Sequence, residues 1–230
     1  MLSVIVPTLN EEKYLPRTLA SIFTPDFKGE VIVADARSRD RTVEIARQYN
    51  CKLVGGGIQA KGRNEGAKIA AGDILFFSDA DVQLPAGFLP AALEEFNRRG
   101  LAIATCSADP ISSHWADRLV YSLANLAVVL AQRTRPLAQG FCIFIKKSLH
   151  DEIGGFDESI TFAEDSEYAA RAARQGKFGV LKSRILVSSR RFEKEGHLKL
   201  SLKYLYLNLR RLLFGEIRRP INYSYGKFSS

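Results

Sequence analysis

Short apolar runs recur along the first half of the chain, and segments with helical spacing of apolar residues separate them. The runs predict buried parallel strands, at residues 3–6, 31–34, 52–54, 74–77 and 102–105. Apolar residues that recur every three or four positions predict helices, at residues 15–22, 42–49, 63–71 and 88–98. Strands that alternate with helices are typical of a mostly parallel, three-layer α/β domain.

The second half of the chain is patterned less regularly. It predicts helices at residues 115–132 and 163–175 and a strand at residues 141–145, with a turn at Gly154 and Gly155. Further on, leucines at helical spacing predict an amphipathic helix over residues 198–214, namely Leu198, Leu202, Leu205, Leu209 and Leu212.

Composition and charge place the chain among globular proteins with a basic end. The hydrophobic fraction is 46% and the charged fraction 25%, as in ordinary soluble domains. Residues 182–227 hold twelve Lys or Arg against three Glu, which is +9, so the rest of the chain carries −1 of the net charge of +8. Such asymmetry favours an anionic partner: a membrane surface, a nucleic acid or a phosphorylated substrate.

Three widely spaced cysteines without a CxxC pair indicate neither a disulfide framework nor a thiolate zinc site. The first residues lack a basic leader, and no apolar run is long enough to span a bilayer. We therefore expect a cytoplasmic protein.

The strongest chemical signal follows the predicted strand at residues 74–77. This apolar run ends in Asp79, Ala80 and Asp81, and alternate residues of an extended segment point the same way. Two carboxylates at the rim of a sheet suit Mg²⁺ or Mn²⁺, whose remaining ligands are commonly substrate phosphates. The alternative is two solvated aspartates that cap the following turn.

A second carboxylate pair, Glu164 and Asp165, stands at the start of a predicted helix. Acidic residues there often only cap the helix N-terminus and interact favourably with the helix dipole. A carboxylate held rigidly at such a position is also able to take a proton from an attacking hydroxyl group.

Two common nucleotide-binding motifs are absent. Gly57 and Gly62 have the spacing of a GxxxxG loop, but Arg63 and Asn64 follow instead of Lys and Ser or Thr, which argues against a Walker-type nucleotidase. The first strand is followed by PTLNEE and not by GxGxxG, which argues against a dinucleotide oxidoreductase. Arg63 is expected at a helix N-terminus, where it would contact a diphosphate.

Four segments together resemble the successive motifs of family 2 glycosyltransferases with the GT-A fold. They are SVIVPTLNEEKYLPRTLASI, VIVADARSRDRTVEIA, GRNEGAKIAAGDILFFSDADVQLP and GGFDESITFAEDSEYAARAARQG. The resemblance covers roughly residues 1–180. It implies a single GT-A domain over residues 1–195, with a nucleotide-binding half at 1–107 and an acceptor half at 108–195, and then a basic tail over 196–230.

The resemblance also implies roles for individual residues. Asp79 and Asp81 match the DxD motif that binds the metal and the donor, and Asp165, beside Glu164, matches the catalytic base. Arg63 lies where a donor contact is expected, and Asp35 matches the aspartate that faces the nucleotide base. The family's opening nucleotide contacts match Pro7, Thr8, Asn10 and Glu11.

The chain departs from the family pattern in two places. Where many members read DDGSTDGT, residues 35–42 lose one acid and gain three arginines, so the resemblance does not fix the base. The QxxRW motif of processive members is absent, and its nearest match is Arg190-Arg191-Phe192. A single transfer is therefore expected. The two arginines would contact the diphosphate or the acceptor, or else be solvated surface charge.

The function implied is an inverting transfer of one sugar from a UDP- or GDP-linked donor to a glycan, lipid-linked or polyprenyl-phosphate acceptor. Two alternatives are a non-catalytic binding module on the same fold and a sugar nucleotidyltransferase. Sugar nucleotidyltransferases usually have a GxGxR motif near the first strand, and this chain has PTLNEE there.

The basic amphipathic helix predicted near the C-terminus has two interpretations. With Lys199, Lys203, Arg210 and Arg211 it would lie in the interface of an anionic membrane, which would make the protein peripheral at the cytoplasmic face. Alternatively, its leucines pack on the domain or on a second subunit as a homodimer. No nucleic-acid partner is expected, because no recognised reading motif is present.

Overall fold

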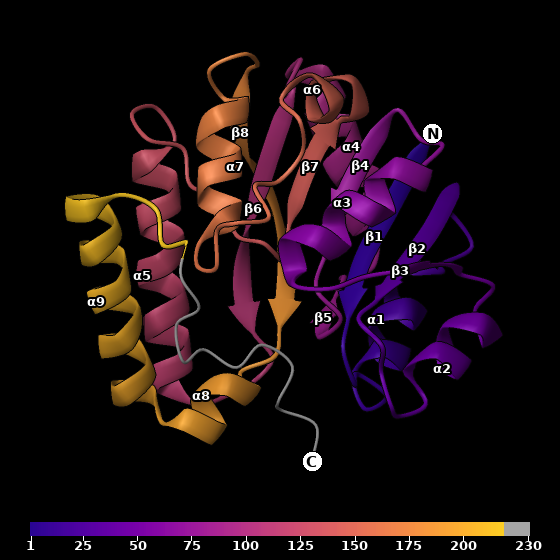
Figure 1. The fold of residues 1–230 in the computed structure, drawn as a ribbon, viewed down its shortest axis with the longest axis horizontal. Coiled ribbons are helices and arrows are strands. Elements are labelled where there is room, and N and C mark those ends of the chain that lie inside the picture. The colour runs from indigo at the N-terminus through magenta and orange to yellow at the C-terminus, as the bar shows by residue number, and fades with distance from the viewer. Residues whose placement is uncertain (219–230) are drawn as a thin grey trace.

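The computed structural model describes residues 1–218, apart from the side chain of Leu198, and residues 219–230 of the predicted tail lie outside the described part. Within residues 1–218 an eight-stranded sheet has the order β3-β2-β1-β4-β7-β6-β8-β5, with helices on both faces (Figure 1). The strands are β1 Leu2–Thr8, β2 Gly29–Asp35, β3 Lys52–Gly55, β4 Ile74–Phe77, β5 Val82–Gln83, β6 Ile103–Pro110, β7 Ile143–Lys146 and β8 Phe178–Val187. The helices are α1 Leu15–Ile22, α2 Thr42–Gln48, α3 Gln59–Ile69, α4 Phe88–Arg98, α5 Trp115–Ala131, α6 Lys147–Glu152, α7 Glu164–Ala172, α8 Arg190–Glu195 and α9 His197–Phe214.

The sheet has a parallel half and a mixed half. β1 pairs in parallel with β2 and with β4, and β2 pairs in parallel with β3. β7 then runs antiparallel to both β4 and β6, β8 is parallel to β6, and β5 closes the edge antiparallel to β8. The predicted mostly parallel α/β sheet is confirmed, and its regular βα half is the half with the clearest sequence pattern.

Side chains that alternate along the strands divide the core into two layers. On β1, Val4 and Val6 point into the cluster beneath α1, α2 and α4, whereas Ile5 points into the cluster beneath α3, α6 and α7. All three side chains are fully buried. Both faces of the strand are therefore covered, which explains why the strand reads as a continuous apolar run.

Glycines bring α3 unusually close to β1. A Cβ atom on Gly66 would overlap the side chain of Ile5, and one on Gly62 would lie 3.2 Å from Pro7 Cβ. Asn64, on the same helix, bonds the backbone of Phe156 twice, accepting from its N–H at 2.8 Å and donating to its carbonyl at 2.9 Å. The GRNEG segment thus joins the first strand to the Gly154-Gly155 turn.

The main differences from prediction lie where the pattern is weak. The prediction that α3 begins at Arg63 was wrong, because the helix begins at Gln59. The longest strand, β8, was not predicted, since Lys182 and Arg184 interrupt its apolar residues and a register shift breaks its pairing with β6. The short elements β5, α6 and α8 were also missed, because six residues or fewer carry almost no periodicity.

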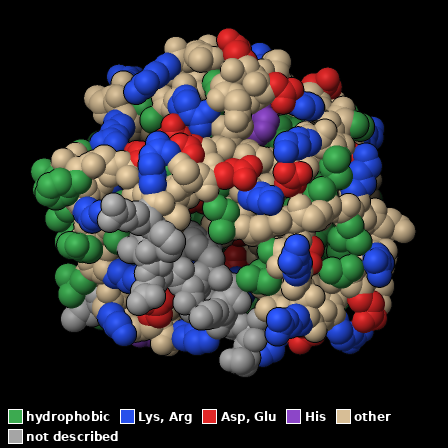
Figure 2. All heavy atoms as spheres, viewed as in Figure 1, with side chains coloured by type: hydrophobic (Ala, Val, Ile, Leu, Met, Phe, Trp, Pro, Cys, Tyr) green, Lys and Arg blue, Asp and Glu red, His purple; other side chains and the backbone are tan. Residues whose placement is uncertain are grey.

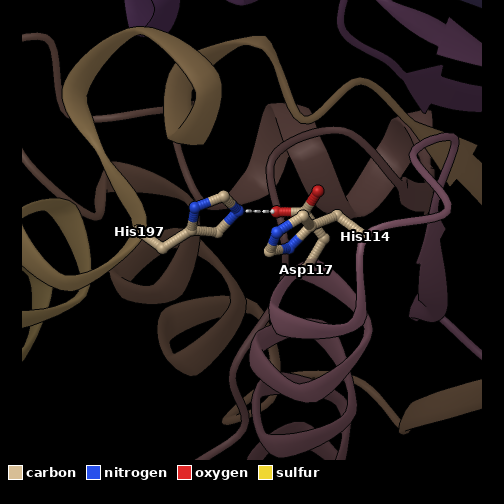
Figure 3. Close-up of side chains that lie close together, drawn as sticks. All are labelled: His114, Asp117 and His197. Carbon is tan, nitrogen blue, oxygen red and sulfur yellow. Dashed lines mark hydrogen bonds and ion pairs between the residues drawn. The ribbon is translucent and has the colours of Figure 1, made fainter.

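Helices α5 and α9 lie side by side at one edge of the molecule (Figure 1). Their first turns are joined by His197, whose Nε2 lies 2.6 Å from Asp117 Oδ1, and by His114, which stacks on His197 at 4.8 Å between ring centroids (Figure 3). Asp117 is 1% exposed. None of the described helices is long and apolar enough to cross a membrane.

Candidate active site

A cavity of about 290 Å³ lies at the carboxyl ends of β1 and β4. Its walls come from the end of β1, the turn after β4, the loop before α3 and the start of α8. Seven of the residues proposed from the sequence line it: Pro7, Thr8, Glu11, Asp79, Asp81, Arg190 and Arg191. The edge of the sheet predicted to bind ligand is thus where the cavity is found.

Arg190 holds two carboxylates at the rim of this cavity. Its Nη1 and Nη2 donate to the two oxygens of Glu11, each at 2.7 Å, and its guanidinium lies 4.4 Å from the ring centroid of Tyr14. Its Nε lies 2.8 Å from Asp81 Oδ2 but without the alignment of a hydrogen bond, so this contact is an ion pair only. The alternative in which Arg190 is solvated surface charge is therefore wrong.

Arg63 forms a second cluster, deeper in the domain. The side chain is 1% exposed, and its Nη1 donates to Glu164 Oε1 at 2.7 Å. Its Nη2 donates to Asp79 Oδ1 and to the Gly140 carbonyl, both at 3.2 Å. Burial alone lowers the pKa of Arg63, but the surrounding carboxylates outweigh it and raise the pKa above its ordinary value. Arg63 is thus a buried cation with carboxylate partners, in the second turn of α3 and not at a helix N-terminus.

Asp165, the predicted base, is held by two backbone donors. Its Oδ2 accepts from the N–H of Gly140 at 2.7 Å, and its Oδ1 accepts from the N–H of Ser166 at 2.7 Å. Burial raises the pKa of Asp165 to about 6, with a further contribution from Glu164, whereas Arg63 and the two backbone donors oppose the rise. Such a carboxylate is ionised at neutral pH and remains a better base than an ordinary aspartate.

Two residues predicted to contact the donor, Asp35 and Asn10, also make hydrogen bonds within the protein. Both oxygens of Asp35 accept hydrogen bonds: Oδ1 from Thr8 Oγ1 at the end of β1 at 3.1 Å, and Oδ2 from the N–H of Ser38 in the following loop at 2.9 Å. Asn10, at φ 54°, accepts from the N–H of Arg39 at 2.8 Å. These two residues build the loop beside the cavity, and Ala36 is the residue of that loop that lines it.

Gly140 is a residue that sequence reasoning missed. It is bonded to Arg63 through its carbonyl and to Asp165 through its N–H, so it joins the two side chains. A Cβ atom there would lie 2.5 Å from Arg63 Nη2 and 3.2 Å from Asp165 Oδ2. Only glycine leaves room for both contacts, but a lone glycine in AQGFC gives no signal in one sequence.

The carboxylates of the cavity have the chemistry of a site for a hard divalent cation. Glu11, Asp79 and Asp81 offer only oxygen ligands, as Mg²⁺ and Mn²⁺ prefer. Burial raises the pKa of both Glu11 and Asp81, Arg190 opposes the rise, and the neighbouring carboxylates add to it. Negative charge is therefore crowded here, and Arg190 offsets it through two hydrogen bonds to Glu11 and an ion pair with Asp81 that lacks hydrogen-bond alignment. These residues fit such a cation.

Comparison with known proteins finds glycosyltransferases among its matches. The sequence profile described as "Glycosyl transferase family 2" matches residues 3–154. The 4,4'-diaponeurosporenoate glycosyltransferase of Staphylococcus haemolyticus is 42% identical over 92 residues, which are 36% of this chain and 24% of that protein. Glycosyltransferase AglE of Haloferax volcanii is 26% identical over 188 residues, which are 76% of this chain and 62% of that protein. The chain thus spans less than two thirds of the length of each.

Solved structures show the same architecture. The mannosyltransferase PcManGT from Pyrobaculum calidifontis, in complex with GDP-Man and Mn²⁺, superposes with a TM-score of 0.68 at 22% identity, covering 89% of this chain and 64% of that one. TarS 1-349 of Staphylococcus aureus, in complex with UDP-GlcNAc, gives a TM-score of 0.67 at 23% identity, covering 82% of this chain and 58% of that one.

Proposed function

This chain belongs to glycosyltransferase family 2 and has the GT-A fold, and we propose that it transfers one sugar, with inversion, from a nucleoside-diphosphate sugar to an acceptor. One observation carries the proposal. A continuous set of contacts runs from Asp79 in the cavity, through Arg63 and Gly140, to Asp165. Such a connection would fix the base relative to the donor, which is what an in-line displacement requires.

The donor would occupy the cavity beside the end of β1. Two solved relatives hold UDP-GlcNAc and GDP-Man, so both UDP- and GDP-linked sugars are candidate donors. Arg190 and Arg191, at the start of α8, would face the diphosphate. Glu11 would keep Arg190 oriented through its two hydrogen bonds.

Asp79 and Asp81 would hold the divalent cation. When bound, Mg²⁺ or Mn²⁺ would supply positive charge to the departing nucleoside diphosphate. Occupation of this site would replace the ion pair between Asp81 and Arg190 and leave that arginine available to the phosphates.

Asp165 would take the proton of an acceptor hydroxyl group. Glu164 would not share this role, because it is 5% exposed and bonded to Arg63. If the acceptor is a polyprenyl phosphate, its oxygen is already ionised near neutral pH and Asp165 matters less. A glycan, a lipid-linked sugar and a polyprenyl phosphate are the candidate acceptors.

The test is thermal stabilisation of the protein by UDP, GDP and their sugars, with and without Mn²⁺. One nucleotide is expected to raise Tm in a Mn²⁺-dependent manner, and Asp81→Asn is expected to abolish this shift while leaving the ligand-free Tm within a few degrees of wild type. No shift with any nucleotide would contradict the proposal. Release of nucleoside diphosphate in the presence of acceptor would separate a transferase from a binding module.

A further inference from the structure

Helices α5 and α9 expose an apolar surface that no described residue covers. Six leucines, each about half exposed, define this α5/α9 face: Leu119, Leu123 and Leu126 on α5 and Leu202, Leu205 and Leu209 on α9. In Figure 2 green side chains gather at the left edge, where Figure 1 places α9. An exposed apolar patch on two adjacent helices marks an interaction site.

The apolar side of each helix points away from the domain. On α9 the buried residues are Leu200, Leu207 and Arg211, and at about 100° per residue Leu205 and Leu209 fall on the opposite side. On α5 the buried residues include Asp117, Asn125 and Val128, again opposite the exposed leucines. Within the described residues these leucines therefore do not pack on the domain, and packing on a second subunit is left as the alternative to a membrane.

The charged residues of α5 and α9 favour an anionic partner for this face. The two helices contain one acidic residue between them, Asp117, and it is buried against His197. Lys199, Lys203 and Arg210 fall together on one flank of the apolar side of α9, and of these Lys203 is paired with Glu195 of α8 at 3.4 Å. In a twofold dimer through this face, cations of one copy would meet cations of the other. An anionic surface meets them favourably.

We propose that the α5/α9 face lies in the interface of an anionic phospholipid bilayer. An apolar stripe flanked by cations is the pattern of a helix that lies in the headgroup region. Trp115, 72% exposed at the start of α5, and Tyr206, 64% exposed on α9, add the amphipathic aromatic side chains favoured at that depth.

The bound face would also lie close to the catalytic segment. Arg211, on the buried side of α9, donates to the Ala163 carbonyl at 3.2 Å, and Leu207 packs with Phe162. Phe162 and Ala163 directly precede Glu164 and Asp165. Docking itself does not depend on the proposed transferase activity. Its consequence, that the acceptor is presented at a membrane, rests on that activity.

The chain carries its own probe, because Trp115 is its single tryptophan and lies beside the face. The full chain would be titrated with vesicles of phosphatidylcholine, alone or mixed with phosphatidylglycerol. A blue shift of the emission and co-sedimentation with the mixed vesicles are expected, weakening as salt rises. No binding to the mixed vesicles, or equal binding to both kinds, would overturn the proposal.

Variants separate the face from general surface hydrophobicity. Leu205→Glu and Leu123→Glu are each expected to lower the vesicle-bound fraction about tenfold, and Lys199→Glu with Arg210→Glu is expected to do the same. Ile69→Glu, at an apolar residue 41% exposed on α3, is the matched control and is expected to bind like wild type. Loss of binding in this control would contradict the assignment.

Thermal stability with nucleotide and the oligomeric state are measured for each variant as well. Each variant is expected to retain the Tm of wild type and its stabilisation by nucleotide, so failure of the donor site would be seen separately from failure of docking. A concentration-dependent dimer that Leu205→Glu dissociates, without vesicle binding in wild type, would assign the face to a second copy and overturn the proposal.

Discussion

Two arginines divide the carboxylates of the site between them, and their surroundings differ. Arg63 is 1% exposed, lies among Glu164, Asp79 and Gly140, and has hydrogen-bond alignment with all three. The Arg190 side chain is 13% exposed at the cavity rim, where its contact with Asp81 is an ion pair without such alignment. The two aspartates of the DxD motif thus face different cations.

The difference indicates different tasks. A buried cation with buried carboxylates is costly to desolvate and is strongly disrupted when one partner is removed, so the Arg63 cluster is suited to fix geometry. The contact of Arg190 with Asp81 lacks hydrogen-bond alignment and is therefore the weaker one to replace, so the Arg190 cluster is suited to respond to ligands. The proposed function places the base with the first cluster and the leaving diphosphate with the second.

Arg63→Met gives the largest expected effect. The substitution leaves Glu164 buried without its cation, and such a loss typically destabilises a protein by about 3–5 kcal/mol. Chemical denaturation would measure the loss, and transfer is expected to fall below detection. Arg63→Lys keeps the charge but loses the forked contacts, so an intermediate loss of stability is expected. Wild-type stability in Arg63→Met would contradict the structural role given to this cluster.

Substitution of Arg190 is expected to change ligand binding and not the stability of the fold. Arg190→Gln removes the competitor for Asp81, so binding of Mn²⁺ in the absence of nucleotide is expected to tighten severalfold. Transfer is expected to fall about 100-fold, because one contact to the diphosphate is lost. Calorimetry and initial rates would measure the two effects. The matched change Arg118→Gln, on an exposed arginine of α5, is expected to alter neither. Weaker metal binding in Arg190→Gln would contradict the proposal that the cation replaces Arg190 as the partner of Asp81.

Both clusters could be foreseen in part. Asp79 and Asp81 follow an apolar strand, so their place at the edge of the sheet follows from the pattern. Arg190 lies 179 residues from Glu11, in a helix too short to carry periodicity, and only the family motif pointed to it. Pairings between such distant segments depend on tertiary packing, which cannot be read from the local pattern of a single sequence.

The same limit applied to the loop residues. Asp35 and Asn10 were proposed as nucleotide contacts on the motif alone, and no local pattern indicated that Ser38 and Arg39 would bond them. Strand and helix assignments were accurate where burial on both sides made the pattern continuous, as in β4. They failed in β8, where charged residues interrupt it.

Gly140→Ala tests the link between the Arg63 cluster and the base, with a smaller expected effect. The added methyl group would meet Arg63 and Asp165, and Arg63 is pinned by Glu164 and has little freedom to withdraw. We expect kcat to fall about tenfold to 100-fold with little change in KM for the donor, because the base is displaced and the cavity is not. Gly57→Ala, in the cavity wall, is the contrasting variant and is expected to raise KM.

The pH dependence of transfer is the mildest test and concerns Asp165. The pKa of this carboxyl is raised to about 6, mainly by burial, so kcat for a hydroxyl acceptor is expected to fall about tenfold per unit below that pH. Because the folded-state pKa lies above the unfolded one, the group stabilises the fold at low pH, and this contribution is lost as pH rises through about 6. Asp165→Asn is therefore expected to raise Tm at pH 7 while it abolishes transfer to a hydroxyl. Transfer with a flat profile from pH 5 to 7, together with substantial activity in Asp165→Asn, would instead identify an acceptor phosphate that needs no base.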